Sequence, residues 1–319
     1  MKLLFSADYH IKLKTKNIPE DWAKSRFRQL FTELALLEQN VDLHIMGGDF
    51  FDKMPTLEEL ELYYEFVASR QCPTYIIPGN HEALKKDTTF FSYLKNITNR
   101  LNDKVEVMDE MHGGIFDIIP YNRLKKFEKE GWPFEAKGNI LITHVRGEIP
   151  PHVKPEIDLT LFDGWQTVLA GDLHSYDNCQ RNILYPGSPL TTSFHRSNVD
   201  TGVIILDTAT MDHEFVKLGL PQLIRKTIQA GEPMPATCPD HTIYEVEGDM
   251  SELADVLDHE LMDKKVVKRN VDTALILHPE MTIEEEMIEY LAYVLQLPQE
   301  TINAVLGEYY NCLKDAKMV

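Results

Sequence analysis

The stretch VLAGDLHS, residues 168–175, is a short apolar run that ends in a glycine and then places an acid and an imidazole two residues apart. Side chains two residues apart on an extended segment point the same way, so Asp172 and His174 can reach one ligand. The same pattern, a predicted apolar strand that runs into groups able to bind protons or metals, recurs upstream. A single pair of this kind is most often a turn or a surface feature, so the ordered repetition carries the inference.

Five predicted strands lead into such groups, and the glycines at 48, 79 and 171 would let the backbone turn there. The segments are Asp8-Tyr9-His10, Gly47-Gly48-Asp49-Phe50-Phe51-Asp52, Gly79-Asn80-His81-Glu82, His144 and Asp172-Leu173-His174. Ligands collect outside the carboxyl ends of the strands in α/β sheets, so we expect these side chains at one rim.

The candidate metal ligands are Asp8, His10, Asp49, Asn80, His144, Asp172 and His174. Mixed oxygen and imidazole donors suit Mn²⁺, Fe²⁺ or Zn²⁺ better than purely hard cations. Seven ligands exceed what one tetrahedral ion uses, and two ions that share a carboxylate account for them better. Such a pair, about 3.5–4 Å apart, clamps a phosphoryl group and activates a water.

Strand and helix signals alternate in the first half of the chain. The predicted helices are Trp22–Leu37, Leu57–Ser69 and Thr88–Ile97. The predicted strands are Lys2–Ser6, Asp42–Met46, Thr74–Ile77, Val105–Met108, Gly114–Pro120, Asn139–Thr143, Thr167–Ala170, Asn182–Tyr185 and Gly202–Leu206. This order indicates an α/β fold with two packed mixed sheets.

Four prolines between Leu218 and Pro239 suggest a boundary. Beyond it we predict a strand at His241–Val246, a helix at Ser251–Met262 and one or two strands within Val266–Leu277. Two helices follow, divided at Leu297-Pro298. Their apolar stripes are Ile283, Met287, Tyr290, Leu291 and Val294, and Ile302, Val305, Leu306, Tyr309 and Leu313. Each stripe packs on its own domain or offers a face to a partner helix.

Composition bounds the function. The chain has 319 residues, 43% of them hydrophobic, and four scattered cysteines that form no CxxC pair. A reduced, cytoplasmic protein is the expectation. The net charge is −19, and residues 221–319 hold eight Lys and Arg against nineteen Asp and Glu. A nucleic-acid substrate would therefore need help from metals, a local basic patch or a partner chain.

These motifs resemble those of the calcineurin-like metallophosphoesterases over roughly residues 1–215. The matching elements are D-x-H at 8–10, G-D-x-x-D at 48–52, G-N-H-E at 79–82, a lone His144 and G-x-x-H at 171–174. Within that superfamily GGDFFDK and the Y-P-G-S-P element at 185–189 most resemble SbcD-type nuclease subunits of double-strand-break repair. The compact length resembles bacteriophage recombination exonuclease subunits, in which case the compartment is the host cytoplasm.

The resemblance implies a two-sheet αββα sandwich and a role for each ligand. Asp8, His10 and His174 would hold one divalent ion, Asn80, His144 and Asp172 a second, and Asp49 would bridge them. His81 would act as the catalytic histidine above the metals, donating to the phosphate or protonating the leaving oxygen. Asp52 and Glu82 would orient histidines, although capping or surface salt bridges are an equal alternative. Mn²⁺ is the expected ion, with Mg²⁺ possible.

Asp172 departs from the family pattern, which is usually Gly-His-x-His. A carboxylate there can still bind a divalent ion, and it should favour Mn²⁺ or Mg²⁺ over softer metals. It should also reduce the Lewis acidity of the metal. The alternative is that Asp172 binds no metal and the second site is weak.

The resemblance implies a DNA nuclease, exonucleolytic on duplex ends and endonucleolytic on single strands, in recombination, repair and replication. It implies domains at 1–220 (nuclease), 221–280 (a small α+β DNA-capping domain) and 281–319, a helical hairpin that binds an SbcC-like coiled-coil ATPase. A homodimer through the nuclease helices at 57–69 and 88–97 is also implied. Candidate DNA contacts, each of which could instead be a solvated surface residue, are Lys12, Lys14, Lys85, Lys86, His195 and Arg196.

Two other functions stay open. A phosphoesterase acting on phosphoproteins or cyclic nucleotides shares the ligand motifs, but Y-P-G-S-P and the long C-terminal extension argue against it. A non-catalytic scaffold that tethers the ATPase to DNA ends is the second, and Asp172 is the sole feature that favours it.

Overall fold

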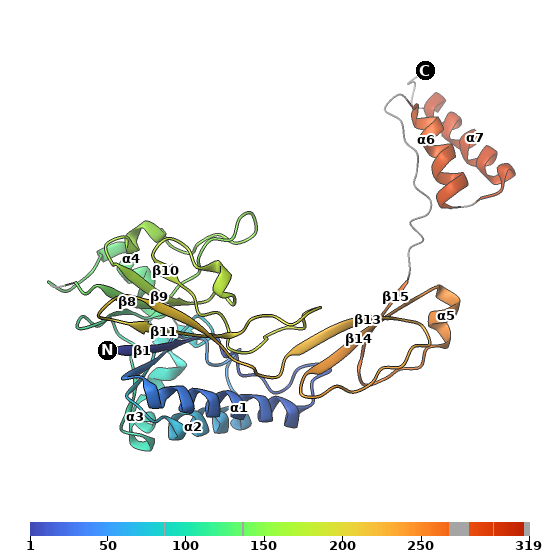
Figure 1. The fold of residues 1–319 in the computed structure, drawn as a ribbon. Helices are drawn as coiled ribbons and strands as arrows, with labels where there is room; N and C mark the ends of the chain where they lie inside the picture. Colours follow the sequence, from blue (N-terminus) through green and yellow to red (C-terminus); the bar gives the residue numbers. More distant parts are fainter. Residues whose placement is uncertain (86, 136, 268–280, 296, 316–319) are drawn as a thin grey trace. The chain divides into compact units, whose positions relative to one another are not determined.

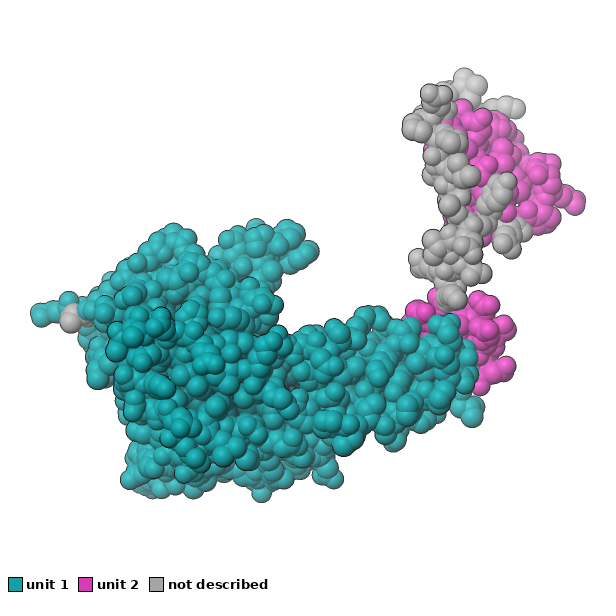
Figure 2. Space-filling model, in the orientation of Figure 1, with its two compact units in different colours: residues 1–246, 256–265 teal, residues 247–255, 266–319 magenta. Residues whose placement is uncertain are grey.

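A computed structural model describes the chain except residues 86, 136, 268–280, 296 and 316–319, and it separates two compact units (Figure 2). The first comprises residues 1–246 and 256–265, and the second comprises residues 247–255 and 266–319. The predicted division places its boundaries at residues 220 and 280, which differ from the limits of these two units. It stays a prediction.

The first unit contains two large sheets (Figure 1). A six-stranded mixed sheet has the order β12-β11-β1-β2-β3-β6, and a four-stranded parallel sheet has the order β10-β9-β8-β7. Their strands are β1 (Lys2–Ser6), β2 (Leu43–Met46), β3 (Thr74–Ile76), β6 (Val105–Val107), β7 (Asp117–Ile119), β8 (Ile140–His144), β9 (Thr167–Gly171), β10 (Ile183–Leu184), β11 (Gly202–Asp207) and β12 (His213–Lys217). β12 was not predicted.

Alternation along the strands builds three layers of core. Leu3 and Phe5 of β1 share a core with Ile142 of β8, so the two sheets pack face to face. Leu4 points the other way, into a cluster with α1, α2 and α3, and Leu141 packs with α4 on the outside of the second sheet. The helices are α1 (Glu20–Leu37), α2 (Leu57–Ser69), α3 (Phe90–Leu101) and α4 (Leu124–Glu130). The predicted αββα sandwich is confirmed.

The start of α3 differs from the prediction. Thr88–Thr89 forms β5, which pairs with β4 (Ala83–Lys85) in a small antiparallel hairpin. Thr89 then caps α3, because its side chain accepts a hydrogen bond from the Ser92 amide. The predicted helix start at Thr88 is therefore wrong by two residues, since the threonines serve as strand and cap.

A third sheet has the order β13-β14-β15, formed by Leu223–Gln229, His241–Gly248 and Met262–Val267. β13 lies inside the segment predicted as a boundary, and its Leu223 is buried. The predicted helix at Ser251–Met262 is too long, since α5 covers only Met250–Asp255. The carbonyl of Leu261 instead accepts a hydrogen bond from the Tyr244 amide, so sheet pairing overrides helical periodicity. The predicted strand residues 268–277 lie outside the described part.

The second unit ends in a helical hairpin. α6 (Ile283–Glu289) continues as a π-helix over Tyr290–Val294, and α7 (Gln299–Asp315) follows Pro298. Ile302 and Leu306 of the second predicted stripe are buried. Among the described helices, none is both long enough and apolar enough to cross a membrane.

Candidate metal centre

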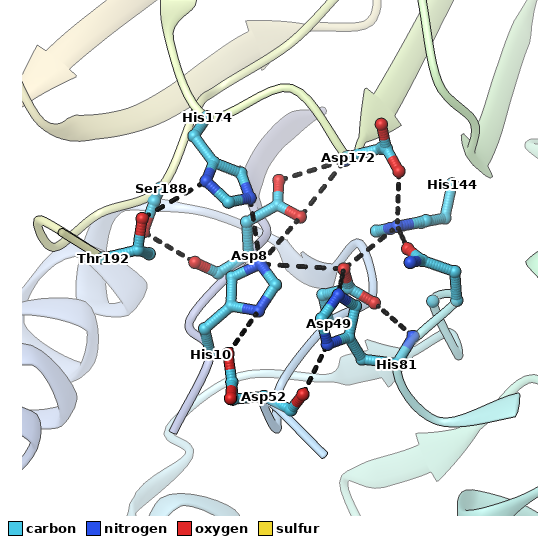
Figure 3. Close-up of polar contacts among 12 residues, drawn as sticks. Asp8, His10, Asp49, Asp52, His81, His144, Asp172, His174, Ser188 and Thr192 are labelled. Carbon is cyan, nitrogen blue, oxygen red and sulfur yellow. Dashed lines mark hydrogen bonds and ion pairs between the residues drawn. The ribbon is translucent and has the colours of Figure 1, made fainter. Parts of the chain in front are cut away.

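The predicted ligands converge at the carboxyl ends of the strands (Figure 3). Asp8 and His10 follow β1, Asp49 follows β2, Asn80 and His81 follow β3, His144 ends β8, and Asp172 and His174 follow β9. Asp8, Asp49 and His144 are almost fully buried, with at most 2% of their surface exposed. Strands from both large sheets therefore supply one site, as the sequence predicted.

Three groups of side chains bring potential ligand atoms within 4.8 Å of one another. They are Asp8 with His10 and His174, Asp8 with Asp49 and His144, and His10 with Asp49 and His81. Asn80 joins the second group, because its Oδ1 lies 2.9 Å from Nε2 of His144. The expected first set and most of the expected second set are thus assembled.

Asp49 lies between the two sets. Its Oδ2 is 3.6 Å from Nε2 of His10 and 3.5 Å from Nε2 of His144. The His10 and His174 Nε2 atoms are themselves only 2.9 Å apart. Nδ1 of His144 donates to the carbonyl oxygen of Gly47 (2.8 Å), which turns the Nε2 lone pair toward the carboxylate and amide oxygens. Imidazole nitrogens and carboxylate or amide oxygens whose lone pairs face one another in this way can bind a cation placed between them.

Burial and mutual repulsion act on the same side chains. Burial, together with the charges of Asp49 and Asp172, raises the pKa of Asp8 well above its ordinary value. Burial would lower the pKa of His144, but the carboxylates of Asp49 and Asp8 raise it well above 6.5. Burial and the neighbouring His174 lower the pKa of His10 to about 3. The carboxylates thus compete for positive charge, which a divalent ion would supply.

The backbone is strained where the ligands sit. Asp8, His10, Asp49 and Asp172 have φ angles of 59°, 46°, 55° and 104°, and they are four of the seven non-glycine residues with positive φ in the described chain. Such conformations cost roughly 1–3 kcal/mol each and persist only where the surroundings impose them. Their concentration among the predicted ligands marks a functional site.

The strand ends are also tied together through the backbone. The amide of Asp8 donates to the carbonyl of Gly48 (3.0 Å), and the amide of Asp172 donates to the Asp8 carboxylate (3.1 Å). A Cβ at Gly79 would lie 2.1 Å from Oδ1 of Asp49, and one at Gly171 would lie 2.5 Å from the carbonyl oxygen of Gly47. These glycines are required for the close approach that the sequence predicted.

Glu82 has a different set of partners from the predicted one. Its carboxylate accepts hydrogen bonds from the backbone amides of Asp49 (3.0 Å), Phe51 (3.0 Å) and Gly79 (2.8 Å). Burial, and then the nearby Asp49, raises its pKa to about 7. Glu82 therefore joins the end of β2 to the end of β3 and fixes the loop that carries Asp49.

Asp52 contacts both histidines of this region. Nδ1 of His81 donates to the Asp52 carbonyl oxygen at 2.5 Å, and Nδ1 of His10 lies 3.9 Å from the Asp52 carboxylate. The His81 ring lies edge-on to the His10 ring, with 4.7 Å between centroids. With Nδ1 engaged, Nε2 of His81 is the atom that faces Asp49, at 3.8 Å. This arrangement orients His81 toward the site, although the sequence did not specify that a backbone carbonyl would do it.

Asp172 has a partner that the sequence did not reveal. Its carboxylate lies 3.2 and 3.4 Å from the guanidinium of Arg146 and 3.9 Å from Nε2 of His144. Arg146 comes two residues after His144, and that spacing was the available signal. Arg146 thus places a positive charge directly beside the Asp172 carboxylate.

The Y-P-G-S-P element contacts the loops that carry the candidate ligands. The Ser188 hydroxyl lies 2.6 Å from the carbonyl oxygens of both Asp8 and Leu190. Thr192, which the sequence did not single out, places its hydroxyl 3.3 Å from Nδ1 of His174. Tyr185 donates to the carbonyl of Val145 at 3.2 Å. The element thus holds the loops after β1 and β8, and the nearby Thr192 contacts the loop after β9.

The candidate DNA contacts are dispersed. Lys12 pairs with Asp52 at 2.8 Å, and Arg196 pairs with Glu245 at 2.7 Å. Lys14 and Lys85 are exposed. His195 lies 3.5 Å from the Ser193 hydroxyl. Lys86 lies outside the described residues.

Comparison with known proteins agrees with this geometry. Residues 1–187 match the family described as calcineurin-like phosphoesterase. The chain is 42% identical over 327 aligned residues to the "Probable exonuclease subunit 1" of Escherichia phage T5, covering 99% of each chain. It is 26% identical to the "Putative phosphoesterase 244L" of Invertebrate iridescent virus 6, over 64% of this chain and 75% of that one. The "Putative phosphoesterase 078R" of Invertebrate iridescent virus 3 is 23% identical over 70% and 67%.

The family match spans more than half of the chain, and the phage relative is similar from end to end. The family's divalent-metal chemistry also agrees with the three ligand groups at the strand ends. The chain therefore belongs to the calcineurin-like phosphoesterase family.

Proposed function

We propose that this protein is a metal-dependent DNA nuclease that hydrolyses phosphodiesters, from duplex ends and within single strands, during recombination, repair and replication. The full-length similarity to a phage protein described as an exonuclease subunit supports a nucleic-acid substrate. The observation that carries the proposal is Asp49, whose carboxylate faces His10 of one ligand set and His144 of the other.

Two divalent ions fit this donor set, and we propose Mn²⁺, with Mg²⁺ as the alternative. Asp8, His10 and His174 would hold the first, Asn80, His144 and Asp172 the second, and Asp49 both. When bound, such a pair supplies Lewis acidity to the phosphoryl group and a water of lowered pKa.

The chain's own residues then position and protonate. Asp8 and Asp49 are fixed by backbone hydrogen bonds, so the ligands need no reorganisation when the substrate binds. His81, held by the Asp52 carbonyl, offers Nε2 on the exposed side of Asp49. We propose that this atom donates to the scissile phosphate or delivers a proton to the leaving oxygen.

The test is Mn²⁺-dependent digestion of an end-labelled duplex by the wild type and by His81→Ala, with the proposed ATPase present. His213→Ala, an exposed histidine on β12, is the matched control. We expect His81→Ala to be slower by about 10²–10⁴-fold, while His213→Ala is unchanged. Equal rates for His81→Ala and wild type would remove His81 from the reaction. Failure of the wild type to cleave would contradict the nuclease.

We also propose that the hairpin of the second unit binds a coiled-coil ATPase of the SbcC type. Ile283, Tyr290 and Val294 of its first helical stripe are exposed, so an apolar face is available for a partner helix. Ile283→Glu combined with Tyr290→Glu should abolish co-elution with the purified ATPase, while Glu286→Gln should not. Retained co-elution of the double variant would contradict this face.

A homodimer through the nuclease helices is the remaining partner proposal. Tyr93, Ile97 and Leu101 of α3 are exposed at helical spacing and form an apolar stripe, whereas Tyr63 and Val67 of α2 belong to the core and are unavailable. Tyr93→Glu should convert a dimer to a monomer in sedimentation experiments. A wild-type monomer at micromolar concentration would contradict the proposal.

A further inference from the structure

A cavity of about 720 Å³ opens beside the metal centre, between the β4 strand, the turn at Tyr121–Arg123 and α4. We call it the α4 groove. The lining residues Tyr121 and Glu156 mark its inner end, the end next to the metal centre, since Tyr121 lies beside His144 and Glu156 accepts from the amide of Arg146. The Tyr121 ring lies edge-on to the His144 ring, with 6.1 Å between centroids, so the groove begins at a candidate metal ligand. Its other wall continues directly from His81 and Glu82 into Ala83, Leu84 and Lys85.

The groove is basic although the chain carries a net charge of −19. Its basic lining residues are Lys85, Arg123, Lys125, Lys126 and Lys129, against the acids Asp87, Glu130 and Glu156. The segment forming α4 buries Leu124 and Phe127 and leaves its lysines exposed. The fold therefore brings together cations from two separate parts of the sequence, β4 and the segment that forms α4, in one groove.

Only some of these cations are already neutralised. Arg123 pairs with Asp87 at 3.1 Å and also with Glu110, Lys125 pairs with Glu128 at 3.2 Å, and Lys126 pairs with Glu130 at 3.9 Å. Lys85 and Lys129 form no ion pair with any described residue. These two lysines are therefore free to bind an anionic ligand.

The groove also offers apolar surface. Leu84 is 41% exposed, and the half-buried Tyr121 presents a ring near the inner end. One aromatic ring beside free lysines suits a ligand that joins planar bases to phosphates, since a base can stack on an aromatic side chain while lysines contact the backbone. The volume is that of a pocket for one small ligand, which suits a nucleotide or two of a single strand and excludes a duplex.

We propose that the α4 groove binds the single-stranded part of a DNA substrate next to the scissile phosphate. Lys85 and Lys129 contact phosphates, and Tyr121 stacks with a base. This inference rests on the proposed nuclease function. The groove would give a single strand a basic path away from the metal centre of an otherwise acidic protein.

The test measures affinity for a single-stranded oligonucleotide with cleavage-resistant phosphorothioate linkages, as a function of salt. Each neutralised phosphate contributes about 0.7 to the slope of log K against log salt for single strands. Lys85→Ala with Lys129→Ala should therefore reduce the slope by about 1.4. Lys104→Ala with Lys217→Ala removes two exposed lysines elsewhere and should leave the slope unchanged. Lys85→Arg with Lys129→Arg should retain it.

Tyr121→Leu should reduce the affinity for the oligonucleotide by about tenfold, which is the effect of losing one stacked base. Tyr121→Phe keeps the ring and should leave the affinity unchanged. Hydrolysis of bis(p-nitrophenyl) phosphate, which is too small to need the groove, is measured separately to report whether the wild type has diesterase activity. Equal salt slopes for that variant and the wild type would overturn the groove proposal even if the wild type cleaves DNA. If the wild type binds the oligonucleotide with the expected salt slope but hydrolyses no diester, the proposed nuclease function is overturned and the groove proposal is not.

Discussion

Glu82→Gln is the substitution that most directly tests how the fold holds its metal ligands. The carboxylate accepts three backbone hydrogen bonds of 2.8–3.0 Å and is 2% exposed. Glutamine keeps one oxygen, which can serve the Asp49 and Gly79 amides, but it turns an NH₂ group toward the Phe51 amide. One buried donor then loses its acceptor, and at pH values above the Glu82 pKa of about 7 two bonds also lose their charged partner.

The magnitude follows from these three bonds. A buried donor without an acceptor costs about 1–3 kcal/mol, and a hydrogen bond to a charged group contributes about 1.5–3 kcal/mol. Relief of the repulsion between Glu82 and Asp49 offsets part of the loss. We therefore expect the free energy of unfolding to fall by roughly 2–4 kcal/mol. Because the loop carrying Asp49 loosens, Mn²⁺ affinity should fall about 10–100-fold, as when other supporting partners of metal ligands are removed.

The assay is urea unfolding followed by tryptophan fluorescence, together with calorimetric titration of Mn²⁺. All three tryptophans, Trp22, Trp132 and Trp165, lie in the first unit, so the signal reports the unit that holds the site. Asp117→Asn is the matched control. Asp117 is a buried carboxylate that accepts from the Gly138 amide (2.8 Å) and the Trp165 indole (2.7 Å), outside the metal centre. Both bonds end on Oδ2, which asparagine can keep as an acceptor, so this variant should lose only the charged partner, with a smaller loss of stability and no loss of Mn²⁺ affinity. A Glu82→Gln protein with wild-type stability and wild-type affinity would refute the reasoning.

Three other outcomes are expected. Asp172→Asn should weaken the second of two Mn²⁺ equivalents in calorimetry by at least about tenfold, whereas two unchanged equivalents would mean that Asp172 serves only to pair with Arg146. Burial lowers the pKa of His44 below its ordinary 6.5, so the unfolded chain binds this proton more readily than the folded chain and stability should fall as pH drops through 6.5; parallel urea–pH curves for wild type and His44→Gln would contradict this. Ser188→Ala should cost about 1–3 kcal/mol of unfolding free energy, because the hydroxyl that bridges two buried carbonyl oxygens is lost, and an unchanged urea midpoint would disagree.

The positions of the candidate ligands could be predicted from the sequence because buried strands have a recognisable pattern of apolar residues. Apolar runs such as Leu3–Phe5 and Ile140–Ile142 alternate between two cores, so their identity as strands follows from composition. The carboxyl ends of the parallel strands β1 and β2, and of β8 and β9, then lie at one rim. Sequence order plus this rule is enough to bring Asp8, Asp49, His144 and His174 together.

The remainder depends on side-chain direction, which sequence does not encode locally. The partners of Glu82 are two amides of the loop after β2 and one amide of its own loop, and the partner of Asp172 depends on the path from His144 to Arg146. Lys85 and Lys129 reach one groove only because α4 lies beside the β4 hairpin. Likewise, β13 lies in the proline-free interval between Pro221 and Pro233, where the flanking prolines hid a strand that pairs with β14.

Anomalous diffraction from crystals soaked in Mn²⁺ tests the central claim most directly. Two peaks about 3.5–4 Å apart, with the Asp49 carboxylate between them, are the predicted result. A single peak, or peaks that the Asp49 carboxylate does not contact, would contradict a shared-carboxylate metal pair.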